Sequence, residues 1–386
     1  MAKELHHKAS KSALWVVYIV IIFEMLYMST PFALFFYSVY GIPLKLLARY
    51  DATLWLVQNI LPHFTQTKSL LINTFLHMSW PLMGIGFLIF IIGFCQVYWA
   101  KFRRRGPVVG GLYRFIRHPQ YAGWVIFGFG MSIFWSRMIV WIMYVSMLFV
   151  YYLLAASEEK ECLEKYGESY SSYLLRTGRF FPRIVRKNKA YSRPLLPQTR
   201  RARISIITFL YLLVIGGTIA MGLLVRSYTL SKISAKYEKD AAVVSLASMD
   251  HGHMSSILSV ALNDPLVKAR LDRAHDGLHA KRLIYIVPSE WHITELAMEA
   301  ETRQERRHGI NPTNHGNPAN FDRNRFKVLI SKALVAANAE GNEILSGARG
   351  QKPLLLVKVD LKKNAVTAIE TPPKQGKYGD LPVPVF

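Results

Sequence analysis

The chain has 386 residues, of which 51% are hydrophobic, and a formal net charge of +23 at pH 7. This composition excludes a single soluble domain, yet long polar stretches remain, so we expect a membrane domain joined to a soluble one. Residues 1–226 contain 26 Lys and Arg against 8 acidic residues, whereas residues 227–386 contain 22 against 17. Because the basic residues flank apolar runs and form no separate arm, they indicate a membrane partner and do not favour nucleic acid. Two cysteines suggest no disulfide framework.

Five apolar runs are candidate membrane spans, since about 20 apolar residues cross a bilayer. In chain order they cover residues 13–40, 70–98, 121–134, 138–155 and 204–225. The first is too long for a signal peptide and lacks a small-residue cleavage site, so we expect a retained anchor. It contains Glu24, a carboxylate expected to be paired or functional in lipid, and a Thr30-Pro31 pair that predicts a kink. Only Trp135-Ser136-Arg137 separates the third and fourth runs, which predicts a short helical hairpin.

Positive residues predict how these spans are oriented. The loop 101–117 and the segment 157–203 carry most Lys and Arg of the membrane region. We therefore expect both on the cytosolic side of a multi-pass protein, in a bacterial inner membrane or the endoplasmic reticulum. Five spans then place the N-terminus in the cytosol and the C-terminal region on the opposite side. If residues 13–40 form two spans, only the N-terminus changes side.

The expected fold class is mostly α: a polytopic helical membrane domain of about five transmembrane helices with an appended C-terminal α+β soluble domain. The expected divisions are an anchor and loop at 1–68, a membrane core at 69–203, the fifth transmembrane helix at 204–226 and the C-terminal domain at 227–386. Apolar and tyrosine residues recur at three- and four-residue steps over 158–176, which predicts an interfacial helix. Such a helix either lies over the mouth of a site or only packs against its neighbours.

The C-terminal region combines helix and strand patterns. Helical periodicity runs over 233–280, and residues 281–287 have the composition of a strand that ends at Pro288. A helix over 292–307 follows. The segments 354–361 and 365–370, on either side of Lys362-Lys363-Asn364, predict a β-hairpin.

One group of polar residues stands at the edge of the predicted spans. It consists of Tyr113, Arg117, His118 and Tyr121 before the hairpin and Glu158 and Glu159 after it. Because the hairpin returns the chain to the same membrane face, the two halves are expected to meet. Together they offer donors for a carboxylate, acceptors for an amine and an aromatic ring or carboxylate for a cationic centre. The alternative is an ion-pair cluster that only anchors the hairpin.

The pattern Gly-x-Tyr-x-x-x-Arg-His-Pro-x-Tyr-x-Gly over 111–123, followed by Glu158-Glu159, Tyr166-Gly167 and Phe181-Pro182, carries a resemblance. Over roughly 80–182 it resembles the isoprenylcysteine carboxyl methyltransferase and phospholipid methyltransferase superfamily of integral membrane enzymes. The resemblance implies S-adenosylmethionine bound on the cytosolic side and a lipid or lipidated substrate entering from the bilayer. It implies cofactor contacts at Tyr113, His118, Pro119, Gln120, Tyr121 and Glu158, and less securely at the backbone of 105–108. Arg117 and Glu159 would support these residues or face the substrate.

Two departures keep alternatives open. The carboxyl methyltransferases carry an arginine one helical turn before the glutamate, where this chain has Leu154. As the methyl acceptor, an amine, a thiol or another lipid-borne nucleophile is therefore favoured over the isoprenylcysteine carboxylate. The run from Glu159 to Tyr173 is also similar to the membrane sterol reductases, which use NADPH, but Gln120 and Trp124 stand where those enzymes have Asn and Asp. A membrane anchor without catalysis, displaying the C-terminal domain, is the other alternative.

Histidine pairs in the C-terminal region have spacings that suit a metal. They are His251 with His253 and His275 with His279. No cysteine or close acidic partner accompanies them, so we interpret them as surface histidines and expect no metal site.

Overall fold

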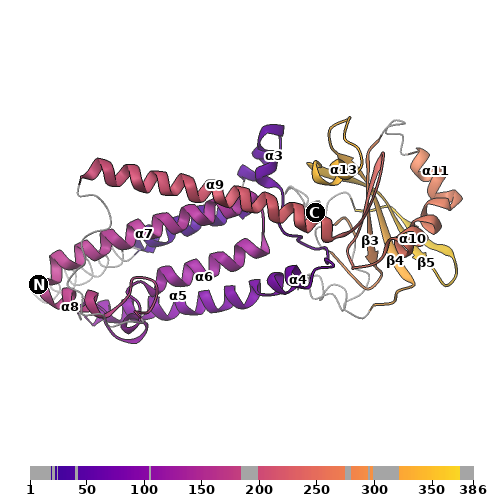
Figure 1. The fold of residues 1–386 in the computed structure, drawn as a ribbon. Coiled ribbons are helices and arrows are strands. Elements are labelled where there is room, and N and C mark those ends of the chain that lie inside the picture. The colour runs from indigo at the N-terminus through magenta and orange to yellow at the C-terminus, as the bar shows by residue number, and fades with distance from the viewer. Residues whose placement is uncertain are drawn as a thin grey trace, which may run out of the picture. The chain divides into compact units, whose positions relative to one another are not determined.

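The computed structural model describes residues 19, 22–23, 25–39, 42–103, 106–183, 199–273, 280–293, 296–298 and 321–373. The described chain is mostly helical and has a strand-containing C-terminal region (Figure 1). It divides into two compact units. The first unit takes residues from Met1–Val39, Ile85–Gly128 and Met143–Tyr211, and the second from Tyr40–Gly84, Phe129–Ile142 and Leu212–Phe386. Glu24 lies outside the described residues.

Three helical segments of the described chain are long and apolar enough to cross a membrane: Leu70–Phe102, Met138–Tyr166 and Ile204–Lys232. The first joins α4 (Leu70–His77) to α5 (Ser79–Phe102), and the others belong to α7 (Met138–Tyr166) and α9 (Arg200–Lys232). The expected third span is α6 (Pro119–Phe134), of only 16 residues, and the expected first span contains the short apolar helix Met25–Val39. The helical character of all five regions is therefore present, whereas the count of five spans is not confirmed.

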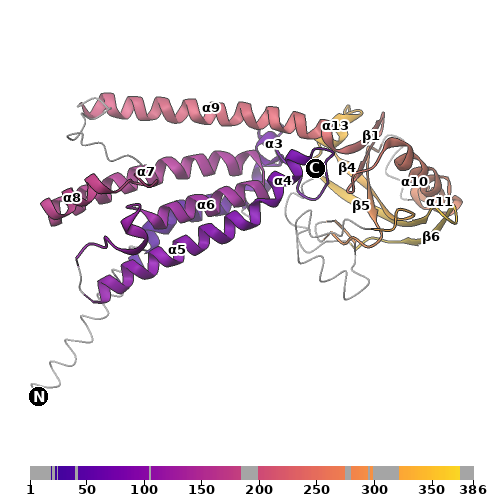
Figure 2. The ribbon, with the colours of Figure 1, turned by 60° about the horizontal axis from the view of Figure 1, so that its bottom comes forward.

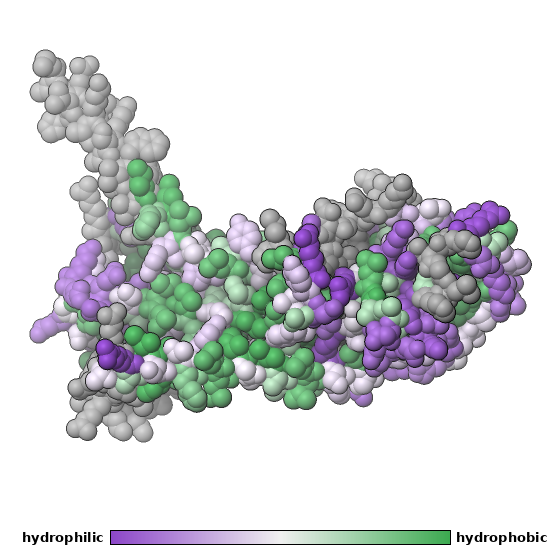
Figure 3. Space-filling model, turned by 90° about the horizontal axis from the view of Figure 1, so that it is seen from above, coloured by the Kyte–Doolittle hydropathy of each residue, from purple (hydrophilic) through white to green (hydrophobic). Residues whose placement is uncertain are grey.

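The exposed surface of the helices is apolar. Large hydrophobic side chains such as Phe87, Leu153 and Leu213 are exposed on α5, α7 and α9. On the face drawn in Figure 3, hydrophobic residues gather over the helices and hydrophilic residues over the strand-containing region. This distribution agrees with an integral membrane protein.

Two glycines set the distance between α5 and α6. A Cβ atom on Gly86 would lie 2.3 Å from the backbone nitrogen of Phe127, and one on Gly123 would lie 2.6 Å from that of Phe90. The backbones can therefore approach only because both positions lack a side chain, as in other membrane helix pairs. Beside this contact the Trp124 ring lies 4.0 Å from Phe32 and 4.2 Å from Phe90, which joins the helix Met25–Val39 to α5 and α6.

The predicted interfacial helix over 158–176 is wrong in its bounds. Residues 158–166 continue α7, because neither proline nor glycine interrupts its 29 residues. A separate helix, α8 (Glu168–Arg176), begins after a turn at Gly167. Tyr170 and Tyr173 are buried on one face of α8, so this helix packs against its neighbours through its aromatic side.

The second unit contains a six-stranded mixed sheet in the order β1-β2-β3-β4-β5-β6. The strands are β1 (Ser234–Glu238), β2 (Ala241–Ser245), β3 (Arg282–Pro288), β4 (Arg325–Leu334), β5 (Gly350–Asp360) and β6 (Ala365–Glu370). Only β2 and β3 pair in parallel, connected through α10 (His251–Asn263) and α11 (Pro265–Arg273). These two helices cover one face of the sheet (Figure 2). The other face packs on α13 (Asn342–Ser346) and on Phe64 from the segment before α4.

The strand over 281–287 and the hairpin of β5 and β6 are confirmed. The helical interpretation of 233–280 is wrong at its beginning, because β1 and β2 precede α10. The segment Ala241-Ala-Val-Val-Ser is apolar at every residue but the last, and β2 is buried on both faces, by α10 and α11 on one side and by the cluster with α13 on the other. Sequence periodicity does not distinguish such a strand from a buried helix. The helix expected at 292–307 lies mostly outside the described residues, and 292–293 and 296–298 are not helical.

Two buried arginines of the second unit bind backbone carbonyls. Arg137 donates from Nη1 to the carbonyl oxygen of Val57 at 2.7 Å. Arg226 of α9 donates to the carbonyl oxygen of Asn59 and, at 3.2 Å, to that of Ser346 at the end of α13. We call Arg137 and Arg226 the arginine pair. Their contacts join the segment before α4 to the α6–α7 turn, to α9 and to the sheet region.

Candidate functional site

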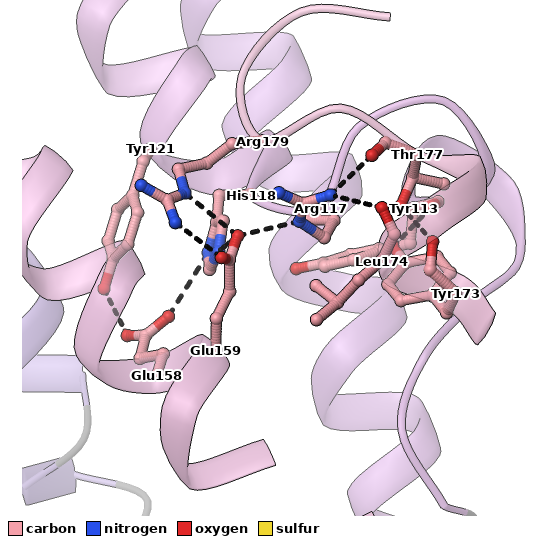
Figure 4. Close-up of polar contacts among 10 residues, drawn as sticks. All are labelled: Tyr113, Arg117, His118, Tyr121, Glu158, Glu159, Tyr173, Leu174, Thr177 and Arg179. Carbon is pink, nitrogen blue, oxygen red and sulfur yellow. Dashed lines mark hydrogen bonds and ion pairs between the residues drawn. The ribbon is translucent and has the colours of Figure 1, made fainter. Parts of the chain in front are cut away.

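The residues of the predicted site come together within the first unit (Figure 4). The segment 116–118 runs beside residues 178–179, with the backbone N–H of Arg117 donating to Gly178 at 2.9 Å and that of His118 to Arg179 at 3.2 Å. Pro119 then begins α6, where its fixed φ and missing N–H suit the first helical turn. The segment after α8 therefore fixes the backbone from which the Arg117 and His118 side chains extend toward α7.

A short 3₁₀ helix, η1 (Gly111–Arg114), positions Tyr113. Gly111 has φ +60°, and a Cβ there would lie 1.9 Å from the side-chain nitrogen of Gln96 on α5. The Gln96 carbonyl accepts a hydrogen bond from the N–H of Leu112 at 3.2 Å, so glycine is required for this contact. Tyr113 is buried, and its backbone oxygen accepts a hydrogen bond from the Tyr173 hydroxyl at 2.6 Å. This bond attaches α8 to the site.

Glu159 is bound by three cationic side chains. Its Oε1 accepts from Arg117 Nε at 2.7 Å and from Arg179 Nε at 3.0 Å, and its Oε2 accepts from Arg179 Nη2 at 2.6 Å. His118 Nε2 lies 3.3 Å from Oε1. The Glu159 side chain is only 9% exposed. The Glu159 carboxylate therefore links α7 to residues 117–118 before α6 and to residue 179 after α8. Little of its surface is left for a ligand.

Arg117 also donates from Nη1 to the carbonyl oxygens of Leu174 at 3.1 Å and Thr177 at 2.5 Å. It thereby supplies the acceptors at the C-terminal end of α8 with a cationic donor. These contacts with Glu159 and with main-chain carbonyls favour a supporting role for Arg117.

Glu158 is the accessible carboxylate. Its side chain is 40% exposed, although it neighbours the buried Glu159 in sequence. It accepts a hydrogen bond from the Tyr121 hydroxyl and lies 3.3 Å from His118 Nδ1. Tyr121 is itself buried, and its ring stacks on Tyr151 of α7 at 4.7 Å. Two buried side chains therefore hold an exposed carboxylate in one orientation.

His118 and Tyr113 have perturbed proton affinities. Burial favours the neutral form of the His118 ring, but the hydrogen bonds and charges of Glu158 and Glu159 outweigh it and raise the pKa of His118 above its ordinary value. Burial raises the pKa of Tyr113 well above its usual range, and the charge of Glu158 raises it further. Tyr113 therefore remains a hydroxyl donor at neutral pH.

The structure thus brings together Tyr113, Arg117, His118, Tyr121, Glu158 and Glu159. Gln120 points toward α5, where its Cγ would lie 3.1 Å from a Cβ on Gly93. Its amide nitrogen is buried and has no hydrogen-bond partner in the part of the chain that the structure describes. Residues 104 and 105 lie outside the described residues, so the expected backbone contact near them stays a prediction.

Sequence reasoning missed Arg179 and Tyr151. Arg179 stands two residues before the Phe181-Pro182 pair that belongs to the motif, and this proximity was the available signal. Tyr151 lies seven residues before Glu158, two helical turns away, and therefore on the same face of α7.

These residues suit a small zwitterionic cofactor. Glu158 offers accessible acceptor oxygens for an amine, and the buried Gln120 amide offers a donor that is not otherwise used among the described residues. They suit a metal poorly. Among the described residues no group of three His, Cys, Asp or Glu could hold an ion. His251 is exposed, His253 Nε2 lies 3.1 Å from the carbonyl oxygen of Arg323, and His275 and His279 lie outside the described residues.

Comparison with known proteins supports the motif analysis. Residues 83–169 match the family model described as phospholipid methyltransferase. The match runs from α5 to the beginning of α8, under a quarter of the chain, and includes every predicted site residue. The resemblance to this superfamily is therefore confirmed. No curated protein and no solved structure matches the chain.

Proposed function

We propose, from the match of residues 83–169 to the phospholipid methyltransferase family, that this membrane protein transfers a methyl group from S-adenosylmethionine to an acceptor carried by a lipid or a lipidated molecule. The family implies methyltransferase activity in general. The identity of the cofactor and that of the methyl acceptor go beyond the family match and are part of this proposal. The residues proposed to hold the cofactor are Tyr113, His118, Pro119, Gln120, Tyr121 and Glu158.

The observation that carries the proposal is the difference between Glu158 and Glu159. A cluster that only anchored the hairpin would bury both carboxylates among internal partners. Glu159 is buried in this way, with Arg117, Arg179 and His118 around it. Glu158 instead remains 40% exposed while Tyr121 and His118 hold it in place. An accessible carboxylate held in one orientation is suited to bind a cationic ligand.

When bound, S-adenosylmethionine supplies an electrophilic methyl group on a sulfonium sulfur. Glu158 would accept hydrogen bonds from the cofactor's α-ammonium group, and Gln120 would donate from its buried amide. Tyr113 and Tyr121, both buried, would exclude water from this region and keep their hydroxyl protons. The contribution of the protein to methyl transfer is then mainly positioning and water exclusion.

The acceptor is proposed to be a lipid-borne amine, thiol or similar nucleophile. Leu154 stands one helical turn before Glu158 on α7, where the carboxyl methyltransferases have an arginine for the substrate carboxylate. An apolar side chain there provides no counter-charge for an anion. The isoprenylcysteine carboxylate is therefore the least favoured of the acceptors considered. A methylation assay on lipid extracts with labelled S-adenosylmethionine identifies the acceptor by the product that carries the label.

The NADPH-dependent reductase is not favoured as an alternative. NADPH carries a pyrophosphate and a further phosphate, which usually require arginine or lysine. Arg117 and Arg179 of the site already bind Glu159.

The test is a thermal unfolding experiment on the full chain in detergent. S-adenosylhomocysteine is expected to raise the thermal midpoint and NADPH at matched concentration to leave it unchanged. A shift of the thermal midpoint with NADPH alone would overturn the methyltransferase proposal in favour of the reductase. No shift with either compound would favour the non-catalytic anchor.

The proposed orientation places the cofactor site in the cytosol and the C-terminal region on the opposite side of the membrane. Single cysteines test it, introduced as Lys160→Cys or Glu343→Cys after Cys95 and Cys162 are changed to serine. In sealed vesicles of known orientation, an impermeant thiol reagent should reach the first from the cytosolic side and the second from the other side. Labelling of both from one side would contradict the predicted number of spans.

A further inference from the structure

His118 is held between two carboxylates. Its Nδ1 lies 3.3 Å from Glu158 Oε2, and its Nε2 lies 3.3 Å from Glu159 Oε1. Neutral imidazole carries one N–H, so both contacts are hydrogen bonds only when the ring is protonated. The raised pKa of His118 agrees with this geometry. The geometry therefore suits an imidazolium ion, 8% exposed, between Glu158 and Glu159.

The two carboxylates do not contribute equally to this charge. Glu159 is already balanced by Arg117 and Arg179, which lie 2.7 Å and 2.6 Å from its oxygens. Glu158 accepts its other hydrogen bond from the neutral hydroxyl of Tyr121. The positive charge of His118 consequently depends mainly on Glu158, which is also the carboxylate that a ligand can reach.

Further rings and cations lie near His118 among the described residues. The Tyr121 ring of α6 stacks on it at 5.6 Å, and the neutral Phe180 ring lies at 6.0 Å. Arg117 and Arg179 act on it as cations from beyond Glu159, and the charge of Lys101 on α5 interacts with Glu158. Further positive charge placed at Glu158 would therefore act on a ring that already has two arginines near it.

We propose that His118 releases its Nδ1 proton when Glu158 binds the α-ammonium group of the cofactor. The N–H bond at Nδ1 breaks and the proton passes to the solvent, while Nε2–H remains hydrogen-bonded to Glu159. Two cations at one carboxylate disfavour the protonated ring, and the ring is the one that can lose its charge near neutral pH. The neutral ring then offers its Nδ1 lone pair as a hydrogen-bond acceptor toward the ligand. His118 is thus a positioning residue whose protonation state depends on occupancy of the site.

This inference rests on the proposed function and makes a separate prediction. If binding releases a proton, affinity rises with pH, by up to about tenfold per pH unit while the free site is protonated and the occupied site is not. A histidine with no such role would leave affinity independent of pH in this range.

The experiment is isothermal titration of the full chain in detergent with S-adenosylhomocysteine, which carries the α-ammonium group. It is run at pH 7 in phosphate and in Tris, whose ionisation enthalpies differ. The dependence of the observed enthalpy on the buffer measures the protons released, and about one per site is expected. 5′-Methylthioadenosine, which shares the adenosine and thioether but lacks the α-ammonium group, should release none. His118→Asn should abolish the release, and the matched control His253→Asn, in the C-terminal region, should preserve it.

The outcomes are distinguishable. Binding of S-adenosylhomocysteine without a buffer-dependent enthalpy, or with proton uptake, would overturn the inference and leave the proposed function standing. Equal proton release with 5′-methylthioadenosine would also overturn it, because the amine would then play no part. No binding of either compound at any pH would remove the proposed function itself. If His118→Asn does not fold, the two compounds compared on the unmodified protein still test whether the α-ammonium group causes the release, and the absence of a difference between them would overturn the inference.

Discussion

The site of the first unit and the arginine pair of the second unit are both buried polar clusters at helix ends, but they are built differently. Arg137 and Arg226 donate to backbone carbonyls of Val57, Asn59 and Ser346. The acceptors of these hydrogen bonds are main-chain groups, which is typical of a structural connection. The site also uses main-chain acceptors, but it pairs Glu158 and Glu159 with other side chains and leaves Glu158 exposed. The difference shows that burial of charge alone does not identify a ligand site. We propose that an accessible group held by buried partners is the better indicator of one.

The largest effect is expected for Glu159→Gln. This change removes the only carboxylate bound by both Arg117 and Arg179 among the described contacts. The free energy of unfolding should fall by about 3 kcal/mol, the lower end for breaking a buried ion pair, because Arg179 is 25% exposed. Denaturation in detergent measures it. Glu164→Gln, whose carboxylate is 66% exposed, is the matched control and should have almost no effect. If Glu159→Gln leaves the free energy of unfolding unchanged, Glu159 is not a structural ion-pair partner and would be assigned, like Glu158, to ligand binding.

Arg226→Met tests the other side of the comparison. The change removes two hydrogen bonds to carbonyl oxygens, and charge-assisted bonds of this kind contribute about 1.5–3 kcal/mol each at most. We expect a loss of about 2–3 kcal/mol in the free energy of unfolding, with Arg226→Lys intermediate. Affinity for S-adenosylhomocysteine in the folded fraction should be unchanged. Reduced affinity at normal stability would show that the arginine pair belongs to the function.

Glu158→Gln is expected to have the opposite effect to Arg226→Met. It should reduce affinity for S-adenosylhomocysteine while leaving the fold intact. Loss of a charge-assisted hydrogen bond to the ligand costs about 1.5–3 kcal/mol, or roughly 10- to 100-fold in the dissociation constant for S-adenosylhomocysteine. Stability should change little, because the side chain is 40% exposed and the amide can still accept from Tyr121. Titration with Glu164→Gln alongside tests whether any nearby carboxylate suffices. Equal affinities for the two variants would remove Glu158 from the site.

Much of the site could be predicted from the sequence, because a hairpin as short as 121–155 must return the chain to the same face. Tyr113, His118 and Glu158 therefore meet as expected. The different environments of Glu158 and Glu159 could not be predicted, since adjacent helical residues differ by 100° in direction and only packing decides which one is buried. Arg179 was missed because its partner lies 20 residues away across the turn at Gly167.

In the C-terminal region β2 was missed, since a strand buried on both faces lacks the alternation of apolar and polar residues that predicts a strand. The domain divisions at 68, 203 and 226 stay predictions.

The smallest effect concerns pH and the stability of the ligand-free protein. The pKa of His118 is raised above its ordinary value of 6.5, chiefly through its hydrogen bonds to Glu158 and Glu159, which outweigh the effect of burial. A raised pKa in the folded state means that the folded protein binds more protons than the unfolded chain. The stabilisation is therefore fully present below pH 6.5 and is lost as the pH rises through the raised value.

For one histidine the slope is at most about 1.4 kcal/mol per pH unit. Chemical denaturation at a series of pH values measures it, and the difference between the unmodified chain and His118→Asn isolates the contribution of this ring from other titrating groups. Glu158→Gln should flatten the profile partly, because Glu159 still binds the ring, whereas the control His253→Asn should leave it unchanged. Stability that rises with pH over this range in the unmodified chain, relative to His118→Asn, would mean that His118 is neutral in the folded protein. The two carboxylates would then not hold an imidazolium between them, and the distinction between an accessible Glu158 and a structural Glu159 would lose its electrostatic basis.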